Sequence, residues 1–361
     1  MLFQLEKTTL ARVAIPLPVN DPFTYAIGEE WIEKIKPGMR VLVPFKNREI
    51  IGFITDTTEE LPTEKTKKII RVLDEEAALS KHFLNLTSWM RNYYFSSWGE
   101  AIQTVIPRFH PKRPRQFQKF EQKPSSSSLN ASITLNSEQK IAVDQITQLL
   151  NTNQFHSVLL FGVTGSGKSE VYIRAIKETL RNGKAAICLV PEIALTEQME
   201  RFFEFHFGSE LEIIHSKLSE GEKWYAWERV RRGDKKIVLG ARSAVFAPFG
   251  RLGLIIVDEE QEPSYKQDQT PRYHAREVAQ WRCQDEGAIL LMGTATPSVE
   301  LMYESQLGQV IQIELTQRIA AKRLPEIEIV DLNQEQQIIK EKVIISRKLR
   351  VAIQKALDKK E

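Results

Sequence analysis

The sequence predicts an α/β fold, in which a doubly wound parallel sheet is preceded by a small β-rich domain. Three observations support this prediction. Apolar segments of strand length alternate with helical segments across residues 135–330, as in a parallel sheet covered by helices on both faces. A glycine-rich loop at residues 162–169 stands between one such strand and a helix. Short strands broken by Pro and Gly occupy the region before residue 107.

The composition is that of a folded chain with more than one domain. For 361 residues, 42% hydrophobic and 27% charged, we expect two or three domains of about 150 residues each. The cysteines, Cys188 and Cys283, are far apart, which argues against a zinc site or a disulfide framework, and Cys188 is expected to be buried. The chain has neither an apolar run of about 18 residues nor a signal-peptide pattern. We therefore expect a cytoplasmic protein without a membrane partner.

Residues 1–107 are predicted to form the first domain, a small barrel or sheet with one or two helices. Its predicted strands cover residues 13–15, 40–45 and 50–55. Residues 80–105 have the apolar spacing of helices. Residues 108–134 are rich in Ser, Pro and basic side chains and are predicted to be a linker. Its six cations, from Arg108 to Lys123, either stay solvated or bind duplex phosphates.

The second domain is predicted to span residues 135–330 and to hold the parallel sheet. Its predicted strands are residues 158–161, 186–190, 211–214, 237–239, 254–257 and 288–292. Ligand loops lie at the carboxyl ends of the strands in such sheets, so we expect the chemistry at that edge. Residues 331–361 are predicted to add a strand and a helix, the helix at about residues 346–360.

The glycine-rich loop has the full spacing of a phosphate-binding loop. Its glycines let backbone N–H groups turn toward phosphates at the start of a helix. We expect Lys168 to reach the β- and γ-phosphates and the Ser169 hydroxyl to bind Mg²⁺. The residues expected to bind nucleotide here are Gly162, Thr164, Gly165, Ser166, Gly167, Lys168 and Ser169.

Two carboxylates follow the strand at residues 254–257. We expect this strand to lie beside the phosphate strand, so that Asp258 binds Mg²⁺ and Glu259 orients and deprotonates the attacking water. Taken alone, the pair fits a solvated acidic turn equally well, but a phosphate loop roughly ninety residues earlier favours catalysis. Lys168, Asp258 and Glu259 are therefore the predicted catalytic residues.

A third segment, residues 293–297, also follows a strand. Its Thr294 and Thr296 can hydrogen-bond the carboxylate segment and couple it to a DNA-binding side. By itself this pattern is weak, because Thr and Pro after a strand commonly cap the next helix.

Aromatic and basic residues alternate after the carboxylates. The aromatic residues include Tyr265 and Tyr273, and the basic residues are Lys266, Arg272 and Arg276. Aromatic faces that stack on unpaired bases, beside cations that contact phosphates, are typical of single-strand binding. Alternatively, the tyrosines are core residues at the junction of a loop and a helix.

Taken in order, these motifs resemble the first motor lobe of a superfamily 2 helicase, and most closely the primosomal protein N′ family of bacterial replication-restart helicases. The segments that carry the resemblance are residues 135–139, 191–196, 240–244, 258–267 and 272–276 in the lobe, and 16–18, 22–25 and 40–45 in the first domain. The resemblance implies a RecA-like lobe in which Gln139 contacts adenine and Arg242 contacts a single strand. It also implies a first domain that binds the 3′ end of a nascent strand.

In that first domain, Phe23 is expected to stack on the terminal base and Lys67 to contact a phosphate, although a core position for Phe23 is the alternative. Two positions depart from the family pattern. Gln261 stands where the family usually has His, and it keeps a hydrogen-bonding group for coupling with the two threonines. Thr24 stands where the family often has Asp, so specificity for the 3′ end stays open.

The resemblance implies an ATP-dependent 3′→5′ DNA helicase that binds stalled or branched forks and helps to load the replisome. ATP and Mg²⁺ are the implied cofactors. The implied partners are single-stranded and branched DNA, other primosome proteins and single-strand-binding proteins. The family's second lobe and zinc sites would lie beyond Glu361, so we expect that this chain cannot unwind DNA alone. The alternative function is a non-catalytic module that binds fork DNA and ATP; a kinase would leave residues 240–244 and 293–297 unexplained.

Overall fold

The computed structural model describes residues 8–60, 63, 66–107, 134–319, 327–339 and 344–359. The predicted basic linker, apart from residue 134, lies outside the described residues, and so do its six cations. The chain forms two compact units, Met1–Ile319 and Ala320–Glu361. The predicted division of the first unit into two domains remains a prediction.

The first part of the larger unit is a five-stranded antiparallel sheet. In spatial order its strands are β2 (Phe23–Ala26), β1 (Thr8–Ala14), β4 (Arg48–Glu60), β3 (Arg40–Phe45) and β5 (Arg71–Val72). The three predicted strands are confirmed as β1, β3 and β4. Alternate side chains such as Val13, Val41 and Ile54 point to one face of the sheet and form its core.

Two helices follow this sheet, α1 (Lys81–Tyr93) and α2 (Trp98–Val105). Each begins at a serine whose side chain accepts a hydrogen bond from the backbone: Ser80 from Phe83 and Ser97 from Glu100. These caps explain why the helical pattern predicted over residues 80–105 divides into two helices.

The second sheet has seven parallel strands. In spatial order they are β12 (Ile311–Leu315), β6 (His156–Gly162), β11 (Ile289–Thr294), β10 (Leu252–Asp258), β7 (Ala185–Leu189), β9 (Ile237–Gly240) and β8 (Leu211–Ile214). The six predicted strands and the α/β fold are confirmed. β12 was not predicted, because at the sheet edge its Gln312 and Glu314 interrupt the apolar run.

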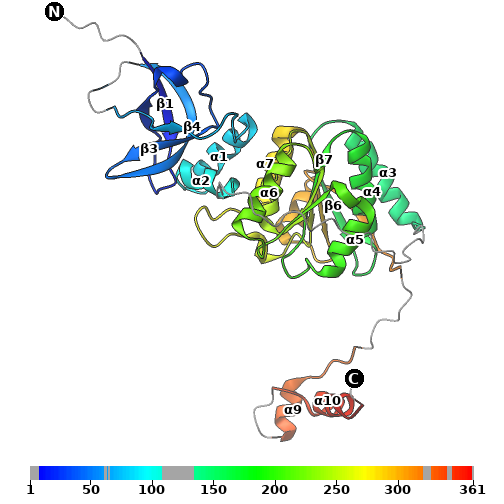
Figure 1. Ribbon diagram of the computed structural model, residues 1–361. Helices are drawn as coiled ribbons and strands as arrows, with labels where there is room; N and C mark the ends of the chain where they lie inside the picture. Colours follow the sequence, from blue (N-terminus) through cyan, green and yellow to red (C-terminus); the bar gives the residue numbers. More distant parts are fainter. Residues whose placement is uncertain are drawn as a thin grey trace, which may run out of the picture. The chain divides into compact units, whose positions relative to one another are not determined.

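Helices cover both faces of this sheet (Figure 1). Along β7, Cys188 points into one core and Ile187 into the other, because successive side chains of a strand face opposite ways. The helices are α3 (Ser137–Asn151), α4 (Lys168–Arg181), α5 (Glu197–Phe207), α6 (Glu220–Arg231), α7 (Ala275–Glu286) and α8 (Val299–Gln306). Helices α3, α4 and α5 share the core of Cys188, whereas α6 and α7 share that of Ile187. Cys188 is buried, as predicted.

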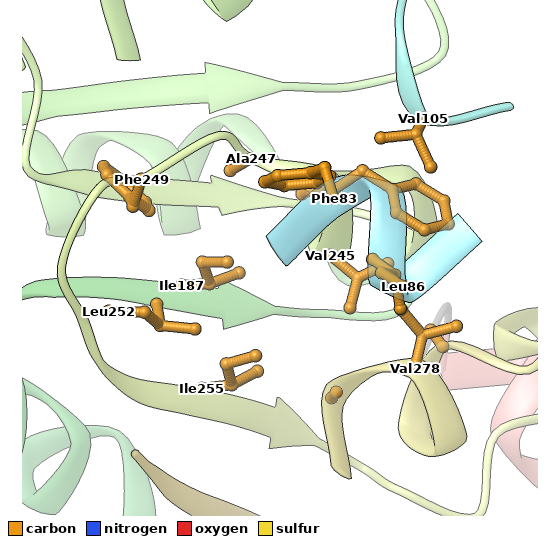
Figure 2. Packing of buried hydrophobic residues seen from close by; sticks show 14 of the residues in the cluster. Phe83, Leu86, Val105, Ile187, Val245, Ala247, Phe249, Leu252, Ile255 and Val278 are labelled. Carbon is orange, nitrogen blue, oxygen red and sulfur yellow. The ribbon is translucent and has the colours of Figure 1, made fainter. Parts of the chain in front are cut away.

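Helix α1 packs on the α6–α7 side of the second sheet. Figure 2 shows Phe83 and Leu86 of α1 near Val245 and Val278, and all four belong to one buried cluster. Val245 lies in the 3₁₀ helix η3 (Arg242–Phe246) and Val278 in α7. The helices of the first domain therefore complete the core of the lobe.

One buried arginine supports this contact. Arg282 of α7 is 1% exposed, and its guanidinium lies 5.0 Å from the centre of the Phe83 ring. It donates hydrogen bonds to the carbonyl oxygens of Val245 at 2.6 Å and Ala247 at 3.0 Å, and it pairs with Glu286 at 2.9 Å. The buried guanidinium therefore has two carbonyl acceptors and an ion-pair partner, which compensate for its removal from water.

The smaller unit contains α9 (Leu332–Ile339) and α10 (Arg347–Lys359), which are joined by an ion pair between Glu335 and Arg347 at 3.1 Å. The helix predicted at residues 346–360 is confirmed by α10. None of the helices that the structure describes combines the length and the apolar character needed to cross a bilayer.

Candidate functional site

The phosphate loop leaves the carboxyl end of β6 and enters α4. Gly165 and Gly167 have φ angles of +80° and +82°, a left-handed conformation that glycine adopts without a Cβ clash. A hydrogen bond of 3.0 Å from the Ser166 amide to the Val163 carbonyl closes the turn, and Thr164 faces solvent. The loop thus has an open outer side at a helix start, where phosphates bind.

The Lys168 side chain folds back along this loop. Its Nζ donates to the carbonyl oxygen of Gly162 at 2.9 Å and lies 3.9 Å from Oε1 of Glu259, and the side chain is 10% exposed. The Ser166 hydroxyl is buried and has no hydrogen-bond partner among the described residues. A lysine bonded to a backbone carbonyl and an orphaned hydroxyl fit a loop that receives phosphate oxygens.

Helix α3 contacts the phosphate loop through Gln139, which is 1% exposed. Its Nε2 donates to the Ser166 carbonyl at 2.9 Å, and its Oε1 accepts from the Asn136 amide at 3.0 Å. Both ends of the amide are therefore bonded to protein. The predicted contact of Gln139 with adenine stays a prediction.

The segment that follows β12 also contacts the loop. The Val163 amide donates to the Leu315 carbonyl at 3.2 Å, and the Ile319 amide donates to the Gly165 carbonyl at 3.0 Å. The phosphate loop is therefore hydrogen-bonded to the chain that leaves the lobe.

Asp258 ends β10 and is held by the Tyr172 hydroxyl of α4, which donates to Oδ1 at 2.7 Å. The prediction that this strand neighbours the phosphate strand is wrong, because β11 lies between β10 and β6. A Cβ at Gly293 of β11 would lie 1.6 Å from the Tyr172 hydroxyl. Glycine at this position therefore lets Tyr172 pass over β11 and reach Asp258.

The two predicted catalytic carboxylates differ in environment. Burial raises the pKa of Asp258, and the hydrogen bond from Tyr172 partly offsets this effect. Burial also raises the pKa of Tyr172 well above its ordinary value, so its hydroxyl stays protonated and donates. The Glu259 side chain is 35% exposed. Both carboxylates are half-buried, and Asp258 is held by a buried donor, which suits a metal ligand beside a base.

The predicted magnesium ligands, Ser169 and Asp258, would offer the ion one hydroxyl and one carboxylate. This set fits the ion, because Mg²⁺ keeps several waters and takes substrate phosphate oxygens as its other ligands. Among the described residues, no group of three or more His, Cys, Asp or Glu side chains is arranged to hold a metal. Zinc stays an expectation from the family resemblance.

Gln261 bridges the carboxylate segment and the end of β11. Its Nε2 donates to Oε2 of Glu259 at 2.9 Å, and its Oε1 accepts from the Thr294 hydroxyl at 2.6 Å. The Thr296 amide in turn donates to the Thr294 hydroxyl oxygen at 2.9 Å. The three residues predicted to couple are therefore in one hydrogen-bonded chain. Their role in coupling remains a prediction.

Glu260, which sequence reasoning missed, is 2% exposed and joins three segments. It accepts from the Ser298 amide at 2.7 Å and pairs with Arg276 at 3.1 Å. The Arg276 side chain, predicted to contact DNA, is 17% exposed and belongs to this internal pair. Its phosphate contact stays a prediction.

Tyr265 and Tyr273 are only 1% and 3% exposed, so the prediction that their rings stack on bases is wrong for this structure. The Tyr265 hydroxyl donates to the carbonyl oxygen of Asp258 at 2.6 Å. The Tyr273 ring packs edge-on against Phe246, with centroids 5.0 Å apart. The alternative of core residues holds, because both rings gain more contact inside the junction than at its surface.

The cations of the same loop are partly accessible. Lys266 and Arg272 are exposed, and Arg272 also donates to the Asp268 carbonyl at 3.1 Å. Arg242 donates to the carbonyl of Ser264 at 3.1 Å and to that of Lys266, so it braces the loop. The phosphate contacts of these three residues stay predictions.

An open pocket of about 840 Å³ lies on the first sheet. Its lining residues are Leu17, Pro18, Val19, Phe45, Lys46, Asn47 and Arg48. Phe23 is 36% exposed, and its ring meets Phe45 edge-on at 5.3 Å, so it borders the pocket. Lys67 is exposed, and its carbonyl accepts from Ala26 at the end of β2 at 2.9 Å. Apolar, aromatic and basic groups therefore meet around this pocket, but the DNA contacts of Phe23 and Lys67 stay predictions.

Sequence reasoning also missed Tyr172, the partner of Asp258. The available signal was its spacing: Tyr172 comes four residues after Lys168, and residues four apart share one face of a helix. The strand order that brings α4 and β10 together is not visible in the sequence.

Two family models match the chain. The model for the 3′ DNA-binding domain of PriA matches residues 12–107, and the model for DEAD/DEAH box helicases matches residues 136–303. The matches cover the first sheet with α1 and α2, and most of the lobe that holds the phosphate loop.

Several curated proteins named replication restart protein PriA are similar to the chain. The protein from Treponema pallidum is 38% identical over 336 residues, covering 91% of this chain and 50% of that protein. The one from Chlamydia pneumoniae is 31% identical over 412 residues, covering 93% and 55%. The one from Bacillus subtilis is 42% identical over 225 residues, covering 62% and 27%. The chain thus spans about half the length of the first two relatives.

The lobe geometry, the two adjacent domain matches and these relatives agree with one another. The chain belongs to the family of PriA replication restart proteins.

Proposed function

We propose that this chain binds ATP·Mg²⁺ and DNA as part of an ATP-dependent 3′→5′ helicase. The helicase would act at stalled or branched replication forks and help to load the replisome. The observation that carries the proposal is the convergence of Lys168 and Glu259 at 3.9 Å, with Asp258 beside them, at the carboxyl edge of one parallel sheet.

Each residue of this site has a defined task in the proposal. Lys168 exchanges the Gly162 carbonyl for the β- and γ-phosphates, while Ser169 and Asp258 hold the magnesium ion. When bound, the ion neutralises charge that develops on the transferred phosphoryl group. Glu259, freed from Lys168, orients the attacking water.

DNA binding is proposed at two places. The pocket beside Phe23, with Lys46 and Arg48 in its lining, would take the 3′ end of a strand. Thr24, the next residue on β2, is exposed and offers only a neutral hydrogen-bonding group. The exposed Lys266 and Arg272 would contact single-strand phosphates. Branched DNA, other primosome proteins and single-strand-binding proteins are the proposed partners, in the cytoplasm. Zinc is proposed only for the complete helicase.

ATP turnover tests this proposal. We would measure it with and without single-stranded DNA for the chain and for Lys168→Ala, alone and with the second lobe of a relative supplied in trans. Arginines acting across such an interface contribute about 10³–10⁵-fold in related phosphoryl transfers. We expect slow turnover by the chain alone, DNA stimulation when the second lobe is present, and neither with Lys168→Ala.

The same assay separates the alternative function. A module that binds ATP and fork DNA without catalysis would retain both affinities, yet its turnover with the second lobe would equal that of Lys168→Ala. If DNA stimulates neither nucleotide binding nor turnover with the second lobe present, the helicase proposal is wrong.

A further inference from the structure

The turn between α1 and α2 displays an unusual phenylalanine. Phe95 is 95% exposed and has a φ angle of +52°. The Tyr94 amide donates to the Met90 carbonyl oxygen at 2.9 Å, and the Ser96 amide donates to the Arg91 carbonyl oxygen at 3.1 Å. These bonds are typical of a helix end at which one residue is left-handed, and that residue is usually glycine. A bulky residue is disfavoured there, and an exposed ring regains nothing through burial.

Tyr94 connects this turn to the loop that carries Lys266 and Arg272. The Tyr94 hydroxyl accepts a hydrogen bond from the His274 amide at 3.2 Å, and the Lys266 ammonium lies 5.4 Å from the centre of the Tyr94 ring. Lys266 and His274 pair with each other across the base of the loop in an antiparallel bridge. Tyr94 therefore contacts both sides of the loop at the point where it begins and ends.

The helix that precedes the turn, α1, is anchored on α7. Trp89 of α1 stacks on Trp281 of α7 with ring centroids 5.8 Å apart. Near the start of α1, His82 and Asp285 approach to 2.6 Å. These contacts hold α1 against the lobe, and Phe95 directly follows Tyr94, the residue that contacts the loop carrying Lys266 and Arg272.

We propose that Phe95 is a base-stacking residue of the single-strand site. An unpaired base would stack on its ring, while Lys266 and Arg272 contact the adjoining phosphates. Phe95 would supply the aromatic face that the loop itself lacks, because Tyr265 and Tyr273 are buried. The inference rests on the proposed DNA binding and extends it to a residue outside every motif of the lobe.

The nearby charges favour this ligand. A polyanion whose units carry flat apolar faces matches a surface that has an exposed ring and two exposed cations. An apolar protein surface would match the ring but would offer no anionic group to the two cations.

Fluorescence anisotropy with labelled oligothymidylate tests the proposal on the full chain. We expect Phe95→Ala to weaken binding about 5- to 100-fold, the effect of losing one stacked base. The salt dependence should stay unchanged, because no phosphate contact is lost, whereas Lys266→Ala should lower the salt slope by about one. Tyr303→Ala is the control, since Tyr303 is a 61% exposed aromatic on α8; it should bind like the unaltered chain.

Two further variants distinguish stacking from a structural role. Phe95→Trp should retain affinity, and its added fluorescence should be quenched by the oligonucleotide. Phe95→Gly should raise the melting temperature, since glycine suits the left-handed position, and yet weaken binding as much as Phe95→Ala does.

The inference is overturned if the unaltered chain binds oligothymidylate and Phe95→Ala binds equally well. It is also overturned if Tyr303→Ala weakens binding as much as Phe95→Ala. If the unaltered chain binds no single-stranded DNA, the proposed DNA binding itself is wrong, and the inference falls with it.

Discussion

The Tyr172 hydroxyl donates a 2.7 Å hydrogen bond to Asp258. This bond joins the helix that begins at the phosphate loop to the carboxylate proposed to hold magnesium, across an intervening strand. It links α4 to the end of β10 within the proposed nucleotide site.

Replacing Tyr172 by Phe should weaken this link. The enclosed Asp258 loses a donor, so we expect a stability loss of about 1–2 kcal/mol and a higher magnesium requirement for binding a fluorescent ATP analogue. Thermal unfolding and a magnesium titration measure the two effects. Gly293→Ala should act similarly, by displacing the Tyr172 hydroxyl. Unchanged magnesium dependence in both variants would show that the bond has no role at the site.

Gln261→Ala should separate nucleotide binding from its response to DNA. The variant breaks the bridge between Glu259 and Thr294. With the second lobe supplied, we expect DNA-stimulated turnover to fall about 5- to 10-fold, the cost of one or two hydrogen bonds, at unchanged ATP affinity. Gln261→His can keep a hydrogen bond and should retain most of the response. A loss in Gln261→His equal to that in Gln261→Ala contradicts the bridge.

Arg282→Leu should destabilise the fold strongly. It leaves Glu286 and two backbone carbonyls without their buried partner, so we expect a loss of about 3–5 kcal/mol in the free energy of unfolding by urea. The control is Arg201→Leu, which removes an exposed pair with Glu197 and should change stability by less than about 1 kcal/mol. Similar losses in both variants would contradict the supporting role of Arg282.

Acidic pH should destabilise the loop between Lys266 and His274, because His274 becomes protonated. Burial lowers the pKa of His274, with Arg276 and Lys266 lowering it further and Glu277 and Glu260 raising it. A lowered folded-state pKa means that this stability is complete above the unfolded value of about 6.5 and is lost as the pH falls through the lower folded value.

Protonation of His274 would also break the cap of α7. His274 Nδ1 accepts from the Arg276 amide at 3.2 Å, which a protonated ring cannot do. The protection factors of the loop amides, which compare hydrogen exchange with its intrinsic rate at each pH, should fall below pH 6.5 in the unaltered chain. His274→Asn can cap the helix without titrating, so its protection factors should lack this fall. Identical pH profiles would exclude His274 as the cause.

The sequence was sufficient where apolar continuity and glycine spacing determine structure. Buried strands such as β7 and β10 are unbroken apolar runs, and the phosphate loop has one workable geometry. The side-chain partners could not be predicted from the sequence, because strand order brings Tyr172 to Asp258 and the segment between β10 and α7 brings Glu260 to Arg276.

Residue types led to a wrong prediction for the tyrosines that follow the carboxylates. Tyr265 and Tyr273 alternate with cations, as in a stacking surface, yet their rings are in the core. The exposed aromatic, Phe95, lies in a helix-ending turn about 170 residues earlier, a distance that local pattern reasoning does not bridge.

The hydrogen bond from Ile319 to Gly165 has a mechanical consequence. The chain that leaves the lobe is attached to the backbone that curls around phosphate. A displacement of the Gly165 backbone therefore displaces Ile319, and a displacement of Ile319 is passed to the phosphate loop.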